Sequence, residues 1–420
     1  MKNKTIDIVG RFTSTTFENK FLINLKKICE ELDSEPTAPI EVLVDLSKLV
    51  WMDLLEGMCL PILSDFIKRK YLNSNIVFTI YTPNQLFTEE PFLKILDFPF
   101  ENIDRIKEER ADKKTHIQMM ENVFYQTLFD WKLIHFLRKK QIDLNLLLDN
   151  KRYPWNDMIF KEEFLFESRK EPERVLEITP ILERRNLPDL RERIEIALKK
   201  DVPNLNDEDL VEFSHLISRL CENICDHAYD VNDLLPRTGA AAIRYTGKGK
   251  KKGLGYIVRR KMRKHDLSLE DVQNKTFRKL QIPERFYSFY NKHYNSAIFE
   301  IVVVDGGKGV YETLKEAYKK NKSKEGRPFE ILRYAFEDGS TSKINIRDKK
   351  AGEEEIGQGL YKVKEAVLKW DGIIEMRSCQ SRITFSRDYE DGLPPDENDP
   401  FKEITHFPGT QLRVLIPEIG

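Results

Sequence analysis

Four short motifs follow one another in the C-terminal half of the chain, each beside the end of a predicted helix or strand. In order they are Glu222-Asn223 with His227, Asp305-Gly306-Gly307-Lys308-Gly309, Gly357-Gln358-Gly359-Leu360, and Gly409-Thr410. The second is the most constraining, because a β-branched strand at 298–304 runs directly into a carboxylate and three glycines. Glycine lets a backbone turn sharply and lets another group approach it closely. The sequence therefore predicts strand and helix ends that are shaped to hold a ligand.

In this order the motifs resemble the nucleotide pocket of the Bergerat-fold (GHKL) ATPases. That family includes histidine kinases, gyrase-type ATPases, the ninety-kilodalton heat-shock chaperones and the MutL proteins. The resemblance runs from about residue 175 to the end, and it implies an ATP-binding domain at 173–420 with ATP and Mg²⁺ as ligands. It also implies an α+β two-layer sandwich, with an insertion at 247–295 and an ATP lid at 310–356.

The resemblance implies a role for each matching residue of the first two motifs. Asn223 would ligate Mg²⁺, a hard cation that takes oxygen ligands and keeps several waters. His227 lies one helical turn later, near the phosphates. Asp305 would accept a hydrogen bond from the adenine amino group, and Gly307 and Gly309 would let the backbone approach the base.

The last two motifs and the lid supply the other implied contacts. Gly357, Gly359 and Leu360 open a helix, where backbone N–H groups and the helix dipole attract phosphate. Lys343 in the lid is a candidate phosphate contact, and the other lid lysines are interpreted as solvated. The Thr410 hydroxyl would join the adenine-binding network beside the aspartate.

One position departs from much of this family. Gyrase-like, MutL-like and anti-sigma kinase members carry a glutamate one turn before the asparagine, as a general base. Here that residue is Arg219, which stays protonated and cannot act as a base. Glu222 is the nearest carboxylate and the candidate catalytic base, but it lies about 100° round the helix from Asn223. Either Glu222 substitutes, a base comes from elsewhere, or hydrolysis is slow or absent.

Residues 1–100 alternate between strand and helix, which indicates a small α/β domain. The apolar spacing predicts helices at 17–32 and 53–70 and strands at 6–9, 40–46 and 76–81. The stretch 42–53 resembles the central strand, loop and helix entry of STAS domains, the anti-sigma-antagonist fold. In that family a phosphorylatable serine commonly follows the helix-entry aspartate. Leu54 follows Asp53 here, so no phosphorylation switch is expected at that place.

A helical connector is predicted at 101–172, with an apolar stripe from 119 to 148 that includes Trp131, Ile134 and Phe136. Beyond it the sequence predicts strands at 175–181, 373–378 and 409–417 and helices at 190–198, 209–228 and 361–369. No internal repeat is found.

Composition excludes some settings. The chain has 420 residues, 40% hydrophobic and 33% charged, with a net charge of -1, so no global field directs it to nucleic acid or membranes. We find no apolar run of about 18 residues and no signal-like start. Five sparse cysteines are typical of reduced thiols in the cytoplasm. Cys221 and Cys225 lie four residues apart without a second pair for zinc.

Several functions fit these observations. The first is a nucleotide-dependent regulatory switch with slow hydrolysis, acting on a protein partner. The second is an anti-sigma-type serine/threonine kinase acting on a STAS-like partner. The third is a nucleic-acid-linked or genome-defence ATPase, which would bind through the basic stretch 248–264. A nucleotide-binding scaffold and a homo-oligomer also stay open. A histidine autokinase is disfavoured, because neither His116 nor His135 is followed by an acidic residue.

Overall fold

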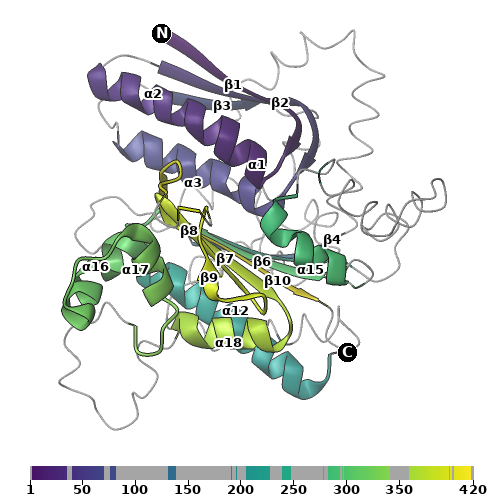
Figure 1. Cartoon of the computed structure of the whole chain (residues 1–420). Coiled ribbons are helices and arrows are strands. Elements are labelled where there is room, and N and C mark those ends of the chain that lie inside the picture. The colour runs from purple at the N-terminus through teal and green to yellow at the C-terminus, as the bar shows by residue number, and fades with distance from the viewer. Residues whose placement is uncertain are drawn as a thin grey trace, which may run out of the picture. The chain divides into compact units, whose positions relative to one another are not determined.

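The computed structural model divides the chain into two compact units, which are described separately (Figure 1). Unit 1 comprises Met1–Lys132 and Thr246–Ser296, and unit 2 comprises Leu133–Tyr245 and Ala297–Gly420. The described residues are 2–35, 40–70, 76–81, 131–138, 191, 195, 205–227, 239–246, 278, 282–293, 296, 298–340, 359–396, 398–399 and 402–417. The chain thus enters unit 1 twice, and its second passage, 246–296, nearly coincides with the predicted insertion at 247–295.

Unit 1 contains a three-stranded parallel sheet in the order β1-β2-β3. Its strands are β1 (Lys2–Phe12), β2 (Ile40–Met52) and β3 (Ile76–Tyr81). Parallel neighbours need a crossover, usually a helix. Between β1 and β2 lie α1 (Ser14–Thr16), the π-helical turn η1 (Phe17–Leu22) and α2 (Ile23–Ser34), and α3 (Leu54–Lys70) follows β2. The predicted alternation of strand and helix in this region is confirmed.

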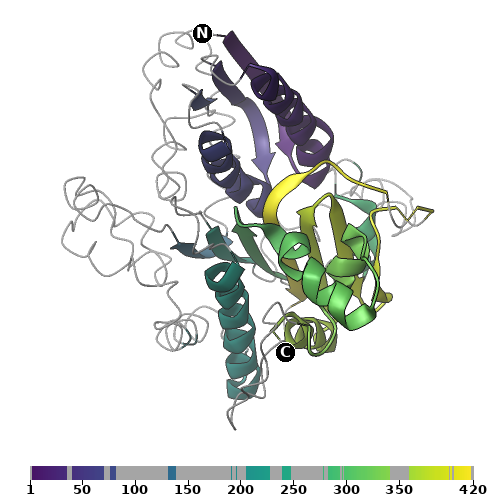
Figure 2. The ribbon, with the colours of Figure 1, turned by 90° about the vertical axis from the view of Figure 1, so that its left-hand side faces the viewer.

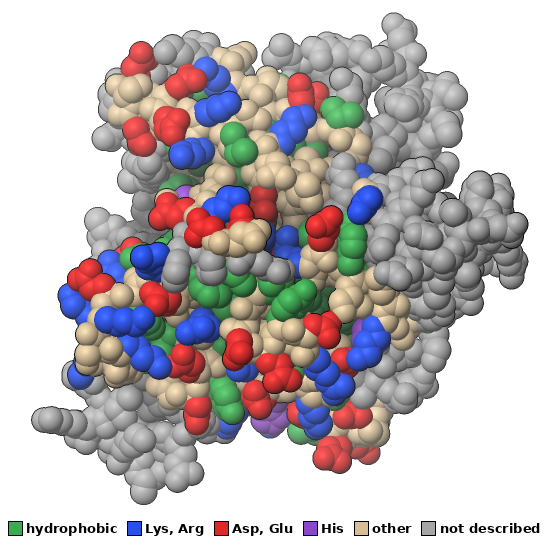
Figure 3. Space-filling view, viewed as in Figure 1, with side chains coloured by type: hydrophobic (Ala, Val, Ile, Leu, Met, Phe, Trp, Pro, Cys, Tyr) green, Lys and Arg blue, Asp and Glu red, His purple; other side chains and the backbone are tan. Residues whose placement is uncertain are grey.

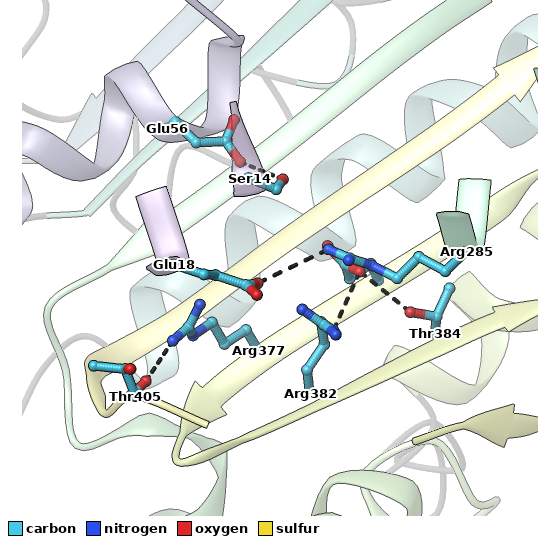
Figure 4. Close-up of polar contacts among 9 residues, drawn as sticks. Ser14, Glu18, Glu56, Arg285, Arg377, Arg382, Thr384 and Thr405 are labelled. Atoms are coloured by element: carbon cyan, nitrogen blue, oxygen red, sulfur yellow. Dashed lines mark hydrogen bonds and ion pairs between the residues drawn. The ribbon is translucent and has the colours of Figure 1, made fainter. Parts of the chain in front are cut away.

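The core of unit 1 includes an aromatic cluster where β1 passes into its helix. The rings of Phe12, Phe17 and Phe21 are buried, and their centroids lie 5.5 to 5.8 Å apart. Beside them the Ser14 hydroxyl donates a 2.5 Å hydrogen bond to the buried Glu56 carboxylate, which ties α1 to α3 (Figure 4). This buried carboxylate therefore has the hydrogen bond that burial of a polar group requires.

The second passage through unit 1 contributes the short turn η5 (Glu284–Phe286) and the helix α15 (Tyr287–His293). Phe286 and Phe289 are buried there, and Arg285 lies 3.9 Å from Glu18 of η1. The described part of the insertion thus has apolar side chains in a core. The basic stretch 248–264, proposed for nucleic acid, lies outside the described residues.

Unit 2 is built on a seven-stranded sheet in the order β4-β5-β6-β10-β7-β8-β9. Five of these strands form consecutive antiparallel pairs: β6 (Ile298–Asp305), β10 (Phe407–Pro417), β7 (Ile373–Cys379), β8 (Ser381–Ser386) and β9 (Tyr389–Leu393). The other two are β4 (Trp131–Arg138) and β5 (Gly239–Thr246). With helices in both units, the predicted mixed α/β class is confirmed.

The two faces of this sheet differ. Because side chains alternate along a strand, the register assigns each residue to one face. One face is apolar and carries Phe299, Ile301, Leu412, Val414, Ile374, Met376, Ile383 and Phe385. The other carries buried charges, with an ion pair of 3.1 Å between Arg413 and Glu300 and one of 3.6 Å between Arg382 and Glu375. Arg377 on the same charged face donates to the Thr405 carbonyl (Figure 4).

Four helices pack on the apolar face: α12 (Asp207–His227), α16 (Gly309–Lys322), α17 (Pro328–Tyr334) and α18 (Gly359–Lys369). The ring of Phe213 on α12 lies 4.9 Å from that of Phe299, and Phe336, just after α17, lies 4.7 Å from Phe385. Figures 1 and 2 show this helical layer against the strands. Among the helices of the described ranges, none has the length and apolarity needed to cross a bilayer.

One prediction needs correction. The connector was predicted to be helical, but Trp131–Arg138 is strand β4, so the helix prediction is wrong there. The segment is a short run rich in apolar and aromatic residues, for which spacing alone does not distinguish a buried strand from a helix. The first part of the predicted ATP lid, 310–334, is occupied by α16 and α17, which bury Leu314, Tyr318 and Leu332. Only 341–356 of the predicted lid remains outside the described residues.

Candidate nucleotide site

The second and fourth motifs meet at one end of the unit 2 sheet. Asp305 is the last residue of β6, and its register partner on β10 is Thr410. Both side chains are buried, with exposed fractions of 4% and 8%. The Gly307 N–H donates a 2.8 Å hydrogen bond to Asp305 Oδ1, which holds the carboxylate against its own turn. The sheet therefore brings together a carboxylate and a hydroxyl that lie about a hundred residues apart in the sequence.

Two glycines of these motifs occupy positions that no other residue fits. Gly409 has φ +87° and Gly309 has φ +79°, in the left-handed region. A Cβ on Gly409 would lie 1.9 Å from the Asp305 carbonyl oxygen. A Cβ on Gly309 would lie 2.5 Å from Ser378 Oγ and 2.8 Å from the Gly409 carbonyl oxygen. The close approach of the two motifs thus depends on both glycines.

Ser378, at the end of β7, belongs to none of the four sequence motifs. Its hydroxyl accepts a 2.8 Å hydrogen bond from the Val310 N–H and donates one of 3.0 Å to the Gly409 carbonyl. Thr410 is the register partner of both Ser378 and Asp305. The only sequence signal was the place of Ser378 at the end of a predicted strand, and that signal does not reveal which strand lies next to it.

Helix α12 carries the first motif, and it packs against α18, which begins with part of the third. Lys369 Nζ near the end of α18 lies 2.5 Å from Glu212 Oε2 near the start of α12. The Phe213 and Trp370 rings lie 5.7 Å apart at the same level. The end of one helix therefore lies beside the start of the other, and the two run antiparallel along their contact.

This pairing sets the level of the first and third motifs. Asn223 follows Glu212 by eleven residues, a rise of about 16 Å at 1.5 Å per residue, and Gly359 precedes Lys369 by ten, about 15 Å. Asn223 and Gly359 therefore lie at nearly the same level along the two helices.

The level of Asn223 on α12 and Gly359 on α18 corresponds to the end of the sheet where Asp305 lies. Helix α18 ends at Lys369, and residues 370–372 connect it to Ile373, the first residue of β7. Ile373 is aligned through Leu415 with Glu300 near the start of β6. The start of α18 therefore lies toward the opposite end, where β6 and β7 finish. Helix α12 also packs on β6 and on α16, which begins just after Asp305. The elements carrying all four motifs thus converge at one end of unit 2.

Helical spacing along α12 separates the three candidate positions of the first motif onto different sides of the helix. Phe213, Leu216 and Leu220 are buried on the side that packs on the sheet. Position 223 follows 216 by seven residues and continues that side, as position 227 does from 220. Position 222 instead follows His215 by seven, on the side where His215 Nε2 lies 3.2 Å from Arg191 Nη1. By helical spacing, positions 223 and 227 therefore share one side of α12, and position 222 lies on another.

Most described lysines near the predicted lid have acidic partners in the helical hairpin of α16 and α17. Lys315 pairs with Glu312, Lys319 with Glu325, Lys322 with Glu337 and Lys324 with Glu330, at 2.5 to 2.9 Å. Figure 3 shows these opposite charges interspersed over the hairpin. They form exposed ion pairs instead of a phosphate cluster, in line with the expectation that these lysines are solvated.

The structure describes two of the four residues predicted to contact phosphate. Gly359 and Leu360 form the first turn of α18 and are half-buried, while Lys343 and Gly357 lie outside the described residues.

Burial raises the pKa of the Cys379 thiol next to Ser378, which keeps this group protonated and weakly reactive.

Within the described ranges, no group of three or more His, Cys, Asp and Glu side chains could hold a metal ion. A Mg²⁺ bound through a single amide and phosphate oxygens does not need such a group.

Comparisons with protein-family models, with curated proteins and with solved structures found no match.

Proposed function

We propose that unit 2 is a Bergerat-type domain that binds ATP with Mg²⁺, and that the protein uses ATP chiefly as a conformational ligand. The observation that carries the proposal is the register that places Asp305 beside Thr410, at the end of the sheet toward which Asn223 and Gly359 also lie. A buried carboxylate next to a hydroxyl can accept the adenine amino group. The start of α18 offers N–H groups to phosphate.

In this proposal Asn223 is the protein ligand of Mg²⁺, and His227, one turn on, is near the phosphates. Gly307 and Gly309 let the backbone approach the base, and Gly357, Gly359, Leu360 and Lys343 contact phosphate. Unit 1, with its three parallel strands, is proposed as a STAS-like domain that reads the nucleotide state or docks a protein partner. The cytoplasm is the proposed compartment.

Slow hydrolysis is proposed because no base stands one turn before Asn223, where gyrase-like, MutL-like and anti-sigma kinase members carry their glutamate. Arg219 occupies this position and cannot accept a proton at neutral pH. Glu222 lies on another side of the helix. ATP would then bind and order the site without rapid turnover, which suits a switch. The kinase and the nucleic-acid-linked ATPase remain alternatives that the described residues do not specifically favour.

The test is equilibrium binding of MgATP, measured by calorimetry. Asp305→Asn removes the charged acceptor for adenine, and affinity should fall by about 10- to 100-fold, the value of a hydrogen bond to a charged group. The matched control is Asp391→Asn, an exposed aspartate of the edge strand β9, which should bind as the wild type does. Equal affinity of Asp305→Asn and wild type would refute the pocket assignment.

The metal and turnover parts have separate tests. Asn223→Ala should abolish the tightening of ATP binding by Mg²⁺, and persistence of that tightening would remove Asn223 from the metal shell. Incubation with labelled ATP distinguishes phosphate release, phosphotransfer and neither. Arg219→Glu restores a carboxylate at the base position and should raise phosphate release. No increase in a variant that still binds ATP would contradict our explanation of slow turnover.

A further inference from the structure

One buried hydroxyl connects three separate parts of the site end. Ser378 is the penultimate residue of β7, and its side chain is fully buried, with 0% exposed. Its Oγ bonds to the backbone N–H of Val310, the second residue of α16, and to the carbonyl of Gly409 on β10. These two backbone groups belong to the segments that follow Asp305 and precede Thr410.

The glycines leave this hydroxyl in a tight position. Ser378 Oγ occupies the place that a Cβ of Gly309 would need, at 2.5 Å, and the same Cβ would lie 3.4 Å from Cys379 Sγ. A Cβ on Gly409, whose carbonyl accepts the hydrogen bond, would lie 1.9 Å from the Asp305 carbonyl oxygen. The two hydrogen bonds of Ser378 therefore link the start of α16 to the part of β10 that carries Thr410.

The two hydrogen bonds satisfy backbone groups that regular structure leaves open. The first N–H groups of a helix have no partner within it, and Val310 is in the first turn of α16. The Gly409 carbonyl lies at a register irregularity between β10 and β7, where the pairing shifts between Phe407 and Thr410. A serine at this place therefore holds two backbone segments in a fixed relation at the end of the sheet.

We infer that Ser378 is a positioning residue for adenine. It sets the distance between the Asp305 turn and the Thr410 strand, and so determines how selectively the site recognises the exocyclic amino group of the base. This inference rests on the proposed ATP site and deepens it. Ser378 acts through Val310 and Gly409 and does not contact the base itself.

The experiment compares binding of ATP and inosine triphosphate, which carries a carbonyl in place of the adenine amino group. Wild type should prefer ATP. Ser378→Ala removes both hydrogen bonds, so the preference should shrink by about tenfold, with most of the loss on ATP. The control is Ser381→Ala, because Ser381 is the register partner of Ser378 on β8, is also buried with 3% exposed, and bonds to neither motif in the described structure.

Each outcome decides something different. If wild type does not distinguish the two nucleotides, the proposed adenine site falls, and the role of Ser378 falls with it. If wild type prefers ATP and Ser378→Ala retains the full preference, only the positioning role is refuted. A general loss of stability would lower both affinities together and leave their ratio unchanged, which also contradicts the inference.

A second variant covers the case in which Ser378→Ala does not fold. Ser378→Cys keeps a side chain of similar size but replaces the hydroxyl by a weak donor and acceptor. It should fold and still lose preference for ATP, together with faster amide exchange at Val310. Full preference with wild-type exchange at Val310 would overturn the positioning role.

Discussion

The two faces of the unit 2 sheet are buried to a similar degree but use different chemistry. The face against the helices packs aromatic and aliphatic side chains, such as Phe299 on Phe213. The other face buries charges in pairs, such as Arg413 with Glu300. Burial of apolar area stabilises in proportion to area, whereas a buried ion pair roughly balances its desolvation cost. The difference indicates that the apolar face supplies the stability that holds the site end in place.

The polar groups of the candidate site lie where the apolar face ends. Asp305, Thr410 and Ser378 are on that face, where β6 and β7 end and the antiparallel β10 begins. The Gly307 N–H donates to the Asp305 carboxylate, and the Ser378 hydroxyl bonds to the backbone of Val310 and Gly409.

The largest expected effect comes from the apolar face. Phe299→Ala removes a fully buried ring that packs on Phe213 and should lower the free energy of unfolding by about 4 kcal/mol. Urea unfolding followed by circular dichroism measures it. Val211→Ala, on an exposed side of α12, is the control and should change little. A loss for Phe299→Ala as small as that of the control would show that the helices do not depend on this face.

A single change on the charged face should be nearly as costly, but a double change should not. Arg413→Met leaves Glu300 buried without this ion pair, and the free energy of unfolding should fall by about 3 kcal/mol. The double variant with Glu300→Leu removes both charges and should recover most of that loss. If the double variant is as unstable as the single one, the pair contributes net stability, and the contrast between the faces is smaller than stated.

At the site end, a single substitution should lower the free energy of unfolding less than on either face, and the loss should depend strongly on which glycine is changed. Gly409→Ala places a Cβ against the Asp305 carbonyl, whereas Gly339→Ala has a similar φ of +76° and meets nothing within 4 Å. The difference between these two matched variants isolates the overpacking, about 2 kcal/mol. Thermal unfolding measures it, and Gly409→Ala should also lose ATP binding. Equal stability of the two variants would mean that the close approach of the motifs is not rigid.

The smallest effect is expected for the exposed pair between the two helices. The hydrogen bond with Glu212 raises the pKa of Lys369, so the interaction stabilises the folded state while the lysine is protonated. The difference in unfolding midpoint between wild type and Lys369→Met should therefore be small at neutral pH. It should disappear as the pH rises through the raised lysine pKa. A difference that grows with pH has the wrong sign for this pair, and Lys320→Met on α16 controls for loss of a surface charge.

Local patterns predicted much of this fold. The β-branched run before Asp305, the apolar strand at 373–378 and the strand that begins at Gly409 were all recognised from the sequence, as were α12 and α18. The segment 131–138 was predicted wrongly, because its apolar residues suit both kinds of element. The α16 and α17 hairpin occupies the first part of the predicted lid, and which lysine pairs with which glutamate there could not be predicted from the sequence.

Within the site, the sequence predicted Asp305, Gly309 and Thr410 but not Ser378. The first three belong to motifs with glycines, which mark special backbone geometry. Ser378 has no such mark, since one serine at a strand end resembles many others. Its importance comes from two hydrogen bonds to residues 68 positions before it and 31 after it.

The sequence by itself determined the secondary-structure elements of the candidate site and the order of its motifs, because side-chain branching, apolar spacing and glycine act over a few residues. Only the tertiary structure decided that β10 lies between β6 and β7, so that Thr410 has Asp305 on one side and Ser378 on the other. It also decided that α12 and α18 run antiparallel, which brings Asn223 level with Gly359. Strand order and helix direction depend on contacts between distant residues, and local propensities do not encode them.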